Sequence, residues 1–349
     1  MTTIRAAIPV KLAVDNFTPP KRTPWGGHRI VNVLKRHLDC DTAGSVVGES
    51  WELSVDPAFP SRLAGSDETL AARIAADPAG WLGRHVEDGG TPILVKLLDT
   101  ADRLSVQVHP ADDYPGLAPG ESGKPECWYV LHAEPGAGLY LGLADGVTQE
   151  TLAKALATGD EVESLLHFVH CDVGDCFVIG PGTVHAIGAG LTLVEPQLVQ
   201  PGLSGKTYRL WDWGRRYRAD GTQDPAGSPR QLHVRDSLAV IDFEAPRAEA
   251  FVASRRVQRA LLQSSGDVRH ERLCELEMLN VERLSGTGEI TIPAVETLAG
   301  ILVTRGGCVI ETSHGALAST MGESVALPAN VGAFRVQLEN AEAVFTYLR

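Results

Sequence analysis

The sequence predicts a mainly β protein built from two small β-barrel or sandwich units. The chain has 349 residues with 36 glycines, which is enough length for two domains and suits many short strands joined by turns. Residues 105–109 alternate polar and apolar side chains, as a strand with one buried face does. Residues 289–349 repeat this alternation in short runs separated by glycine and proline, which predicts a second β unit.

The first strands are expected close to the N-terminus. Residues 8–12 have the composition of a strand, and a proline-rich stretch follows them. Residues 48–54, GESWELS, form a second candidate strand with polar side chains repeated on one face.

Two segments of the N-terminal half carry apolar residues at helical spacing. Residues 67–86 are expected to form one helix capped by Asp67 and a second that begins at Asp77-Pro78. Residues 148–168 are expected to form another pair of short amphipathic helices. Both pairs, at about residues 67–88 and 148–168, are therefore read as insertions between strands.

The strand at 105–109 introduces candidate metal ligands. Alternate side chains of a strand share a face, so Gln107 and His109 are expected to point the same way. Pro110 ends this strand, and Lys124-Pro125-Glu126 later leads into an apolar, aromatic run. Glu126 is therefore expected at the start of the next strand.

A second segment supplies a further ligand. In residues 174–188, a short strand is followed by a Gly-Pro-Gly turn and then by His185, so the backbone fixes where this imidazole lies. Any one of the 11 histidines alone carries little weight. Two histidines, a carboxylate and a glutamine oxygen together suit zinc or another borderline divalent ion, with a position left open for water or substrate.

Charge and cysteine usage restrict the class of protein. The formal net charge of −13 argues against nucleic acid or an anionic membrane as a partner, so an anionic substrate needs a local basic pocket. The six cysteines show no CxxC spacing, which favours free thiols in the cytosol. A leader sequence and an apolar run of roughly 20 residues are both missing, so we expect a cytoplasmic protein.

The motifs VQVHP, GKPECWYV and GTVHAIGAG resemble those of the phosphomannose isomerases of the cupin superfamily, in particular the short bacterial form. The similarity covers most of residues 18–242. It implies a jelly-roll β-barrel that holds one zinc ion per chain through the residues matching Gln107, His109, Glu126 and His185. In one departure from the general cupin pattern, Gly180 stands where proline is usual and Pro181 follows it.

The resemblance also implies residues around a substrate. Lysines and an arginine of the family match Lys96, Lys124 and Arg209, and Trp25 is either a core residue or part of a pocket wall. Lys124 and Glu195 occupy strand positions whose side chains are expected to face the pocket near the ion, so they are candidates for carrying a proton. Arg209 completes the candidate catalytic set. Arg209 with Lys124 or Arg215 is expected to bind a phosphate group.

The resemblance predicts two cupin-type barrels. Residues 1–242 are the expected metal-binding catalytic domain with its helical insertions, and residues 243–349 are the second β domain. In the second domain, residues 322–329 resemble a cupin motif without its histidine, so no metal ligands are expected there.

The implied activity is a metal-dependent aldose–ketose isomerisation of mannose 6-phosphate and fructose 6-phosphate, by proton transfer between C1 and C2. The alternatives are an isomerase of another phosphorylated sugar, an iron-dependent cupin oxygenase and a non-catalytic sugar-binding cupin. The expected partner is a small sugar phosphate, and the chain is expected to be a monomer or a homodimer.

Overall fold

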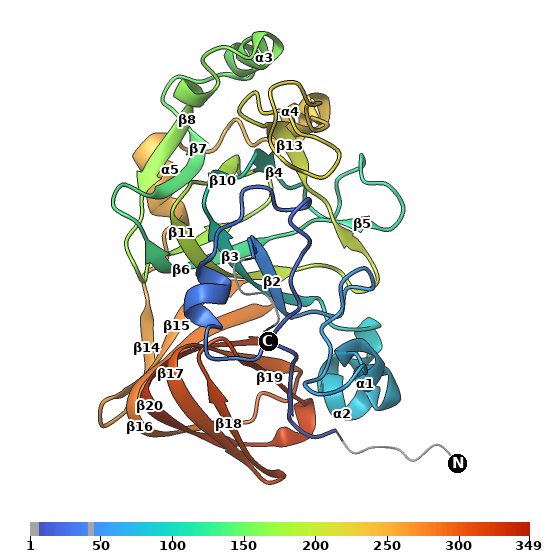
Figure 1. Cartoon of the computed structure of the whole chain (residues 1–349), viewed down its shortest axis with the longest axis vertical. Helices are drawn as coiled ribbons and strands as arrows, with labels where there is room; N and C mark the ends of the chain where they lie inside the picture. The colour runs from blue at the N-terminus through green and yellow to red at the C-terminus, as the bar shows by residue number, and fades with distance from the viewer. Residues whose placement is uncertain (1–6, 41–44) are drawn as a thin grey trace.

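The computed structural model describes residues 7–40 and 45–349. Three sheets account for most of the regular structure, so the prediction of a mainly β protein is confirmed. Figure 1 shows the strands of the C-terminal sheet at one end of the molecule and helix α3 at the other. The strand orders describe open sheets, and their closure into barrels stays a prediction.

The first five-stranded sheet crosses the middle of the molecule. Its strands, in spatial order, are β2 (Glu49–Leu53), β3 (Ile93–Thr100), β11 (Leu191–Leu198), β6 (Glu126–Ala133) and β9 (Cys176–Ile179). All of its neighbouring strands are antiparallel. Strand β2 confirms the expected strand at 48–54.

The second five-stranded sheet lies beside the first. Its strands, in spatial order, are β13 (Tyr208–Trp211), β4 (Val106–Val108), β10 (His185–Ile187), β7 (Gly138–Leu143) and β8 (Leu166–His170). A separate parallel pair consists of β5 (Glu121–Ser122) and β12 (Ser204–Gly205). Leu139 and Leu141 from this sheet share an apolar core with Val130 and Leu193 from the first, so the two sheets enclose a common interior.

The largest sheet is mainly C-terminal. Its main path runs β1 (Val10–Lys11), β19 (Ser324–Leu327), β17 (Ala299–Thr312), β20 (Phe334–Leu348), β16 (Leu279–Ile292), β15 (Val268–Leu276) and β14 (Ala260–Ser265), and β18 (Gly315–Thr320) pairs with β17. The alternating runs of the C-terminal part are therefore strands, as predicted. Strand β1 is shorter than the predicted strand at 8–12, and it joins this distant sheet.

The helices are short and flank the sheets. They are α1 (Leu70–Ala76), α2 (Pro78–Leu82), α3 (Gln149–Thr158), α4 (Val234–Val240) and α5 (Ala248–Arg255), with a π-helix η1 (Ile30–Leu34) and 3-10 helices η2 (Gly83–Asp88), η3 (Glu163–Leu165) and η4 (Ala329–Val331). None of the helices among the described residues is both long and apolar enough to cross a membrane.

Two details of the helix prediction are wrong. Helix α1 is capped by Thr69, whose hydroxyl accepts from the Ala72 N–H, and not by Asp67. The second half of the segment at 148–168 is not an amphipathic helix, because the 3-10 helix η3 leads directly into strand β8. That strand gains its stability from pairing with β7, which lies earlier in the chain. The predicted helix start at Asp77-Pro78 is confirmed by α2.

The first sheet is buried on both faces. Val95 and Leu97 of β3 share a core with Leu302 and Val344 of the C-terminal sheet. Leu98 on the opposite face belongs to the interior between the two five-stranded sheets. This accounts for the nearly continuous apolar sequence of β3, and it places Lys96 in a buried strand.

Candidate functional site

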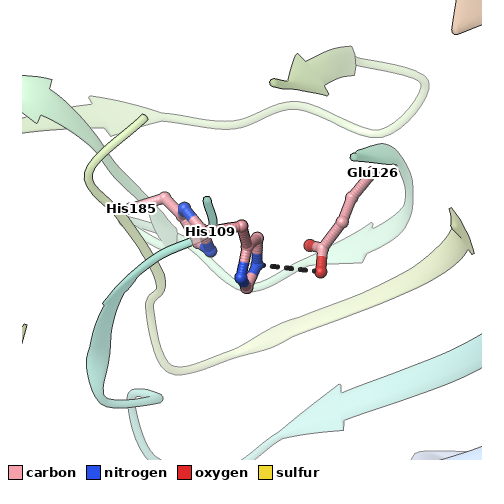
Figure 2. A group of neighbouring side chains, drawn as sticks. All are labelled: His109, Glu126 and His185. Atoms are coloured by element: carbon pink, nitrogen blue, oxygen red, sulfur yellow. Dashed lines mark ion pairs between the residues drawn. The ribbon is translucent and has the colours of Figure 1, made fainter. Parts of the chain in front are cut away.

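Three predicted ligands meet inside the N-terminal part of the molecule (Figure 2). Glu126 opens β6 of the first sheet, while His185 opens β10 and His109 follows β4 in the second. One potential ligand atom from each residue lies within 4.8 Å of the others, and all three residues are buried. The gap between the two sheets is therefore bridged by two imidazoles and one carboxylate.

Backbone carbonyls determine which imidazole nitrogens face the group. The Nδ1 of His109 lies 3.0 Å from the Lys206 carbonyl, and the Nδ1 of His185 lies 2.9 Å from the Thr183 carbonyl. A carbonyl only accepts, so both Nδ1 atoms carry the proton and both Nε2 atoms keep a lone pair. This is the tautomer that binds metals through Nε2.

The environment also keeps both imidazoles neutral. Burial lowers the pKa of His185 to about 3, with the neighbouring His109 adding to the effect. Burial and the Lys124 ammonium together lower the pKa of His109. Neutral imidazole is the form that coordinates a metal ion.

The atoms of the group present lone pairs that suit a bound cation. His109 Nε2 is buried without a hydrogen-bond partner among the described residues, and it lies 3.1 Å from Glu126 Oε1. In the tautomer given above, both atoms present lone pairs; Lys124 and Gln197 contact the Glu126 oxygen, whereas the His109 nitrogen has no such partner, and a cation placed between the two atoms would satisfy it. The donor set of nitrogen and carboxylate oxygen fits zinc and similar divalent ions.

Gln107, the predicted fourth ligand, lies directly across from His185 in the β4–β10 pairing. Paired residues on neighbouring strands share a face, so the amide side chain is on the side of the imidazole. Its Nε2 donates to the Ser105 hydroxyl at 3.4 Å, which leaves the amide oxygen free to face another group.

A cavity of about 240 Å³ lies next to the group, because Lys124 and Gln197 line it and contact Glu126. Five of the predicted site residues line it: Trp25, Lys96, Gln107, Lys124 and Arg209. Its wall also contains residues that the sequence analysis did not assign to a site, among them Arg22, Glu49, Trp51, Gln197 and Arg230. The cations gathered in this wall provide the basic pocket that an anionic substrate requires in an acidic protein.

Lys124 links the cavity to the predicted ligands. Its Nζ lies 2.8 Å from Glu126 Oε1, and the side chain is mostly buried. Burial lowers the pKa of Lys124, but the carboxylates of Glu126 and Glu195 outweigh it and leave the pKa raised. In these surroundings Lys124 is a fixed positive charge at neutral pH.

Glu195 is buried beside the cavity, on β11. The Nε1 of Trp128 donates both to Glu195 Oε1, at 3.0 Å, and to Glu126 Oε2, at 3.1 Å. Burial and the nearby Glu126 carboxylate raise the pKa of Glu195 to about 8, against the effect of Lys96 and Lys124. A carboxyl group with this pKa can hold or release a proton near neutral pH.

Lys96 and Trp25 form other parts of the site. Lys96 Nζ lies 3.3 Å from Glu195 Oε2 and 4.8 Å from the centre of the Trp51 ring. Trp25 lines the cavity and also packs in the core beside Leu98, so it is both a wall residue and a core residue.

Two arginines of the predicted set differ in their surroundings. Arg209 lines the cavity, with its Nε bonded to the Ser105 hydroxyl at 3.2 Å, and burial lowers the pKa of its guanidinium. Arg215 is instead held by Asp212 and Asp102 at 2.7 and 2.9 Å, and it is not among the residues that line the cavity. Arg230 lines the cavity while paired with Asp212 at 2.7 Å.

Some of the missed residues left a signal in the sequence. Gln197 has the same strand parity as Glu195, and in the structure it lies in the cavity wall and bonds to Glu126 Oε1 at 2.5 Å. Arg22 and Arg230 have no such signal, because they come from irregular segments that only the tertiary structure brings to the cavity.

No family model matches the chain. Individual relatives do match. The mannose-6-phosphate isomerase of Streptococcus mutans is 31% identical over 287 residues, which span 77% of this chain and 83% of the relative. The mannose-6-phosphate isomerase ManA of Bacillus subtilis is 30% identical over 265 residues, which span 76% of this chain and 77% of the relative.

Solved structures show the same fold. The mannose 6-phosphate isomerase of Bacillus subtilis superimposes with a TM-score of 0.81 at 23% identity, over 98% of this chain and all of the other. A zinc-bound mannose 6-phosphate isomerase superimposes with a TM-score of 0.72 at 16% identity, again over 98% of this chain and all of the other. The chain thus has the fold of these isomerases, and the family resemblance predicted from the sequence is confirmed. On the strength of the identity and coverage shared with its relatives, the chain belongs to the mannose-6-phosphate isomerase family.

Proposed function

We propose that this chain is a metal-dependent isomerase that interconverts mannose 6-phosphate and fructose 6-phosphate. The observation that carries the proposal is the buried group of His109, Glu126 and His185 at a cavity walled by cationic side chains. Membership of the mannose-6-phosphate isomerase family supplies the substrate.

One zinc ion per chain is the proposed cofactor. His109, Glu126 and His185 would hold it through two Nε2 atoms and a carboxylate, with the Gln107 amide oxygen as fourth ligand. When bound, the ion polarises sugar oxygens and stabilises negative charge that develops on them. The backbone carbonyls of Lys206 and Thr183 fix the tautomers of His109 and His185. Both Nε2 atoms are left unprotonated, which supports this assignment.

Glu195 is the proposed proton carrier between C1 and C2. Its raised pKa, its burial and its position beside the cavity support this role. Lys96 and the Trp128 indole hold one carboxyl oxygen each, so the side chain is oriented before the substrate arrives. Lys124 stays charged beside Glu126 and is placed to donate to an oxygen that gains negative charge.

The phosphate group is proposed to bind at the arginine side of the cavity. Arg209 and Arg230 both line this wall, and a guanidinium matches the planar, forked geometry of a phosphate contact. Lys96 and Trp25 complete the wall around the sugar.

The proposed catalytic unit is residues 1–242, and residues 243–349 are proposed as a second β domain without metal ligands. The separate apolar core of the C-terminal sheet supports this division from Val268 onward, while Phe251 and Val252 of α5 pack in the interior of the first unit. The segments at 67–88 and 148–168 are insertions of the first unit. A small sugar phosphate is the proposed partner, and the chain is expected to act in the cytoplasm as a monomer or homodimer.

A coupled assay tests the proposal. Formation of fructose 6-phosphate from mannose 6-phosphate would be measured on the purified protein, after chelation and after zinc is restored. Activity that is lost and then regained supports both the isomerase and its metal. His185→Ala is expected to abolish zinc binding and turnover, whereas His170→Ala, at an exposed position on β8, leaves both unchanged. A folded, zinc-loaded sample without turnover would refute the proposed substrate.

A further inference from the structure

A second cavity of about 480 Å³ lies in the C-terminal sheet. It shares no lining residue with the cavity next to the candidate metal ligands. Its floor comes from three neighbouring strands, β15, β16 and β20. Its rim is formed by Leu262 and Gln263 of β14, by residues 292–295 and by Arg84 of the distant helix η2.

Polar side chains stand on a face of this sheet that is otherwise apolar. On β15, His270 has the same strand parity as the core residue Val268; on β16, Asn280 and Glu282 have the parity of Leu284. His270, Asn280 and Glu282 are each at most 6% exposed. Burying such groups among apolar side chains costs free energy, and that cost is typical of sites with a function.

The polar network is only partly satisfied. Glu282 accepts from His270 Nε2 at 2.6 Å and from the Tyr347 hydroxyl at 2.9 Å, so both of its oxygens are engaged. Three other buried atoms of lining residues lack a partner among the described residues: His270 Nδ1, Arg272 Nε and Asn280 Oδ1. Both donors and acceptors are thus left without partners, which a molecule with hydroxyl groups can satisfy.

Three guanidinium groups surround the cavity, although the chain as a whole carries a net charge of −13. Arg84, Arg272 and Arg349 line it, and Glu282 is the one carboxylate among the lining side chains. Glu275 contacts Arg272 and Arg349 from outside the lining. With Glu275 and Glu282 both counted, the three guanidinium groups still outnumber the carboxylates around the cavity, which favours an anion.

We propose that this cavity is a binding site for a small hydroxylated anion, of the phosphorylated or carboxylated polyol class. Its anionic group would lie among Arg84, Arg272 and Arg349. Its hydroxyls would bond to His270 and Asn280 at the floor. The site is independent of the proposed isomerisation, since its residues are not part of the first cavity.

Hydrogen–deuterium exchange of the full chain tests this site separately from the first cavity. The probes are 6-phosphogluconate, gluconate and inorganic phosphate. We expect 6-phosphogluconate to slow exchange in peptides that cover residues 268–284 and 292–297. Protection by gluconate but not phosphate would assign the carboxylate, and the reverse would assign the phosphoryl group. Protection confined to peptides of the first cavity, or none with any probe, would overturn the proposal.

Matched variants of one strand provide the control. Arg272→Gln removes a lining guanidinium and is expected to raise the half-maximal concentration of 6-phosphogluconate for this protection at least tenfold. Arg269→Gln changes an exposed arginine on the opposite face of β15 and should leave it unaltered. Equal effects of both variants would contradict the site. If Arg272→Gln does not fold, Arg84→Gln on η2 replaces it with the same expectation. Arg272→Gln is also expected to retain isomerase activity.

Discussion

Lys96 and Glu195 are paired directly across the β3–β11 register, with Lys96 Nζ 3.3 Å from Glu195 Oε2. The ammonium lowers the pKa of Glu195, while burial and Glu126 raise it more strongly. The pKa of about 8 that results is thus a balance that one substitution can shift.

The pH dependence of turnover should follow this balance. A base works only when ionised, so kcat/KM is expected to rise with pH up to about 8, where Glu195 loses its proton. Lys96→Met removes a charge that lowers this pKa and should move the rising limb to higher pH. Lys154→Met, on the exposed side of α3, is the control. Superimposable pH profiles for Lys96→Met and the wild type would rule out Glu195 as the titrating group.

Glu195→Gln tests the proton carrier itself. The amide keeps the size of the side chain and an oxygen that can accept from Trp128, but it cannot take up a proton. We expect kcat to fall by roughly 10²–10⁴-fold, the usual contribution of a general base, with zinc content unchanged. Steady-state kinetics and metal analysis of the same sample provide the check. A variant that binds zinc and turns over at the normal rate removes Glu195 from this role.

Trp128→Phe removes the indole N–H that donates to two buried carboxylates. We expect the variant to lose about 1–3 kcal/mol of stability beyond the loss of packing, because acceptors are left unsatisfied. Trp81→Phe is the matched control, since the Nε1 of Trp81 is equally buried but has no partner among the described residues. The measurement is urea unfolding of both variants. Equal losses would show that the two hydrogen bonds contribute nothing.

Lys124→Met separates catalysis from metal binding. The ammonium lies 2.8 Å from a carboxylate that would also face the ion, so the two cations compete for the same negative charge. We expect the variant to bind zinc several-fold more tightly and to turn over more slowly. A competition titration with a zinc chelator measures the first effect and the coupled assay the second. Weaker zinc binding would contradict the proposed repulsion.

The buried ion pair of Lys35 and Glu52 is expected to matter for stability. Their side chains are 0% and 2% exposed, and Glu52 Oε2 also accepts from Ser324 of the C-terminal sheet at 2.9 Å. Glu52→Ala leaves a buried ammonium uncompensated, and a cost of roughly 3–5 kcal/mol is expected. Asp15→Ala, which breaks the exposed pair with Arg62, should cost less than about 1 kcal/mol. Urea unfolding of the two variants distinguishes these values.

Local sequence patterns were sufficient to predict that His109, Glu126 and His185 lie together. The alternation before Pro110 and the glycine turn before His185 position side chains through backbone geometry alone, and such geometry is readable from spacing. The same logic failed for the segment at 148–168, because a five-residue strand such as β8 is stabilised by a partner elsewhere in the chain. Five residues are too few for an alternating pattern that would distinguish a strand from a helix.

The rest of the cavity depends on tertiary contacts. Arg230 lies in its wall because Asp212 holds the guanidinium, and the two residues come from an irregular segment and from the end of a strand. The helix cap was missed for a local reason. Asp67 and Thr69 are both good caps, and only the path of the chain decides that Thr69 lies at the first turn.

Strand β1 has a consequence for the order of folding. Val10 pairs with Ala326, so one edge of the C-terminal sheet is formed by a segment that precedes both five-stranded sheets in the chain. That edge cannot be completed until β19, which follows both five-stranded sheets in the chain, has been synthesised, although folding during synthesis generally proceeds from the N-terminus. Until then, β1 lacks its strand partner β19, and the Lys11 carbonyl can accept only from the nearer Ala64 N–H while the intervening sheets assemble. This is a contact of extreme sequence separation, and contacts of that kind slow the final step of folding.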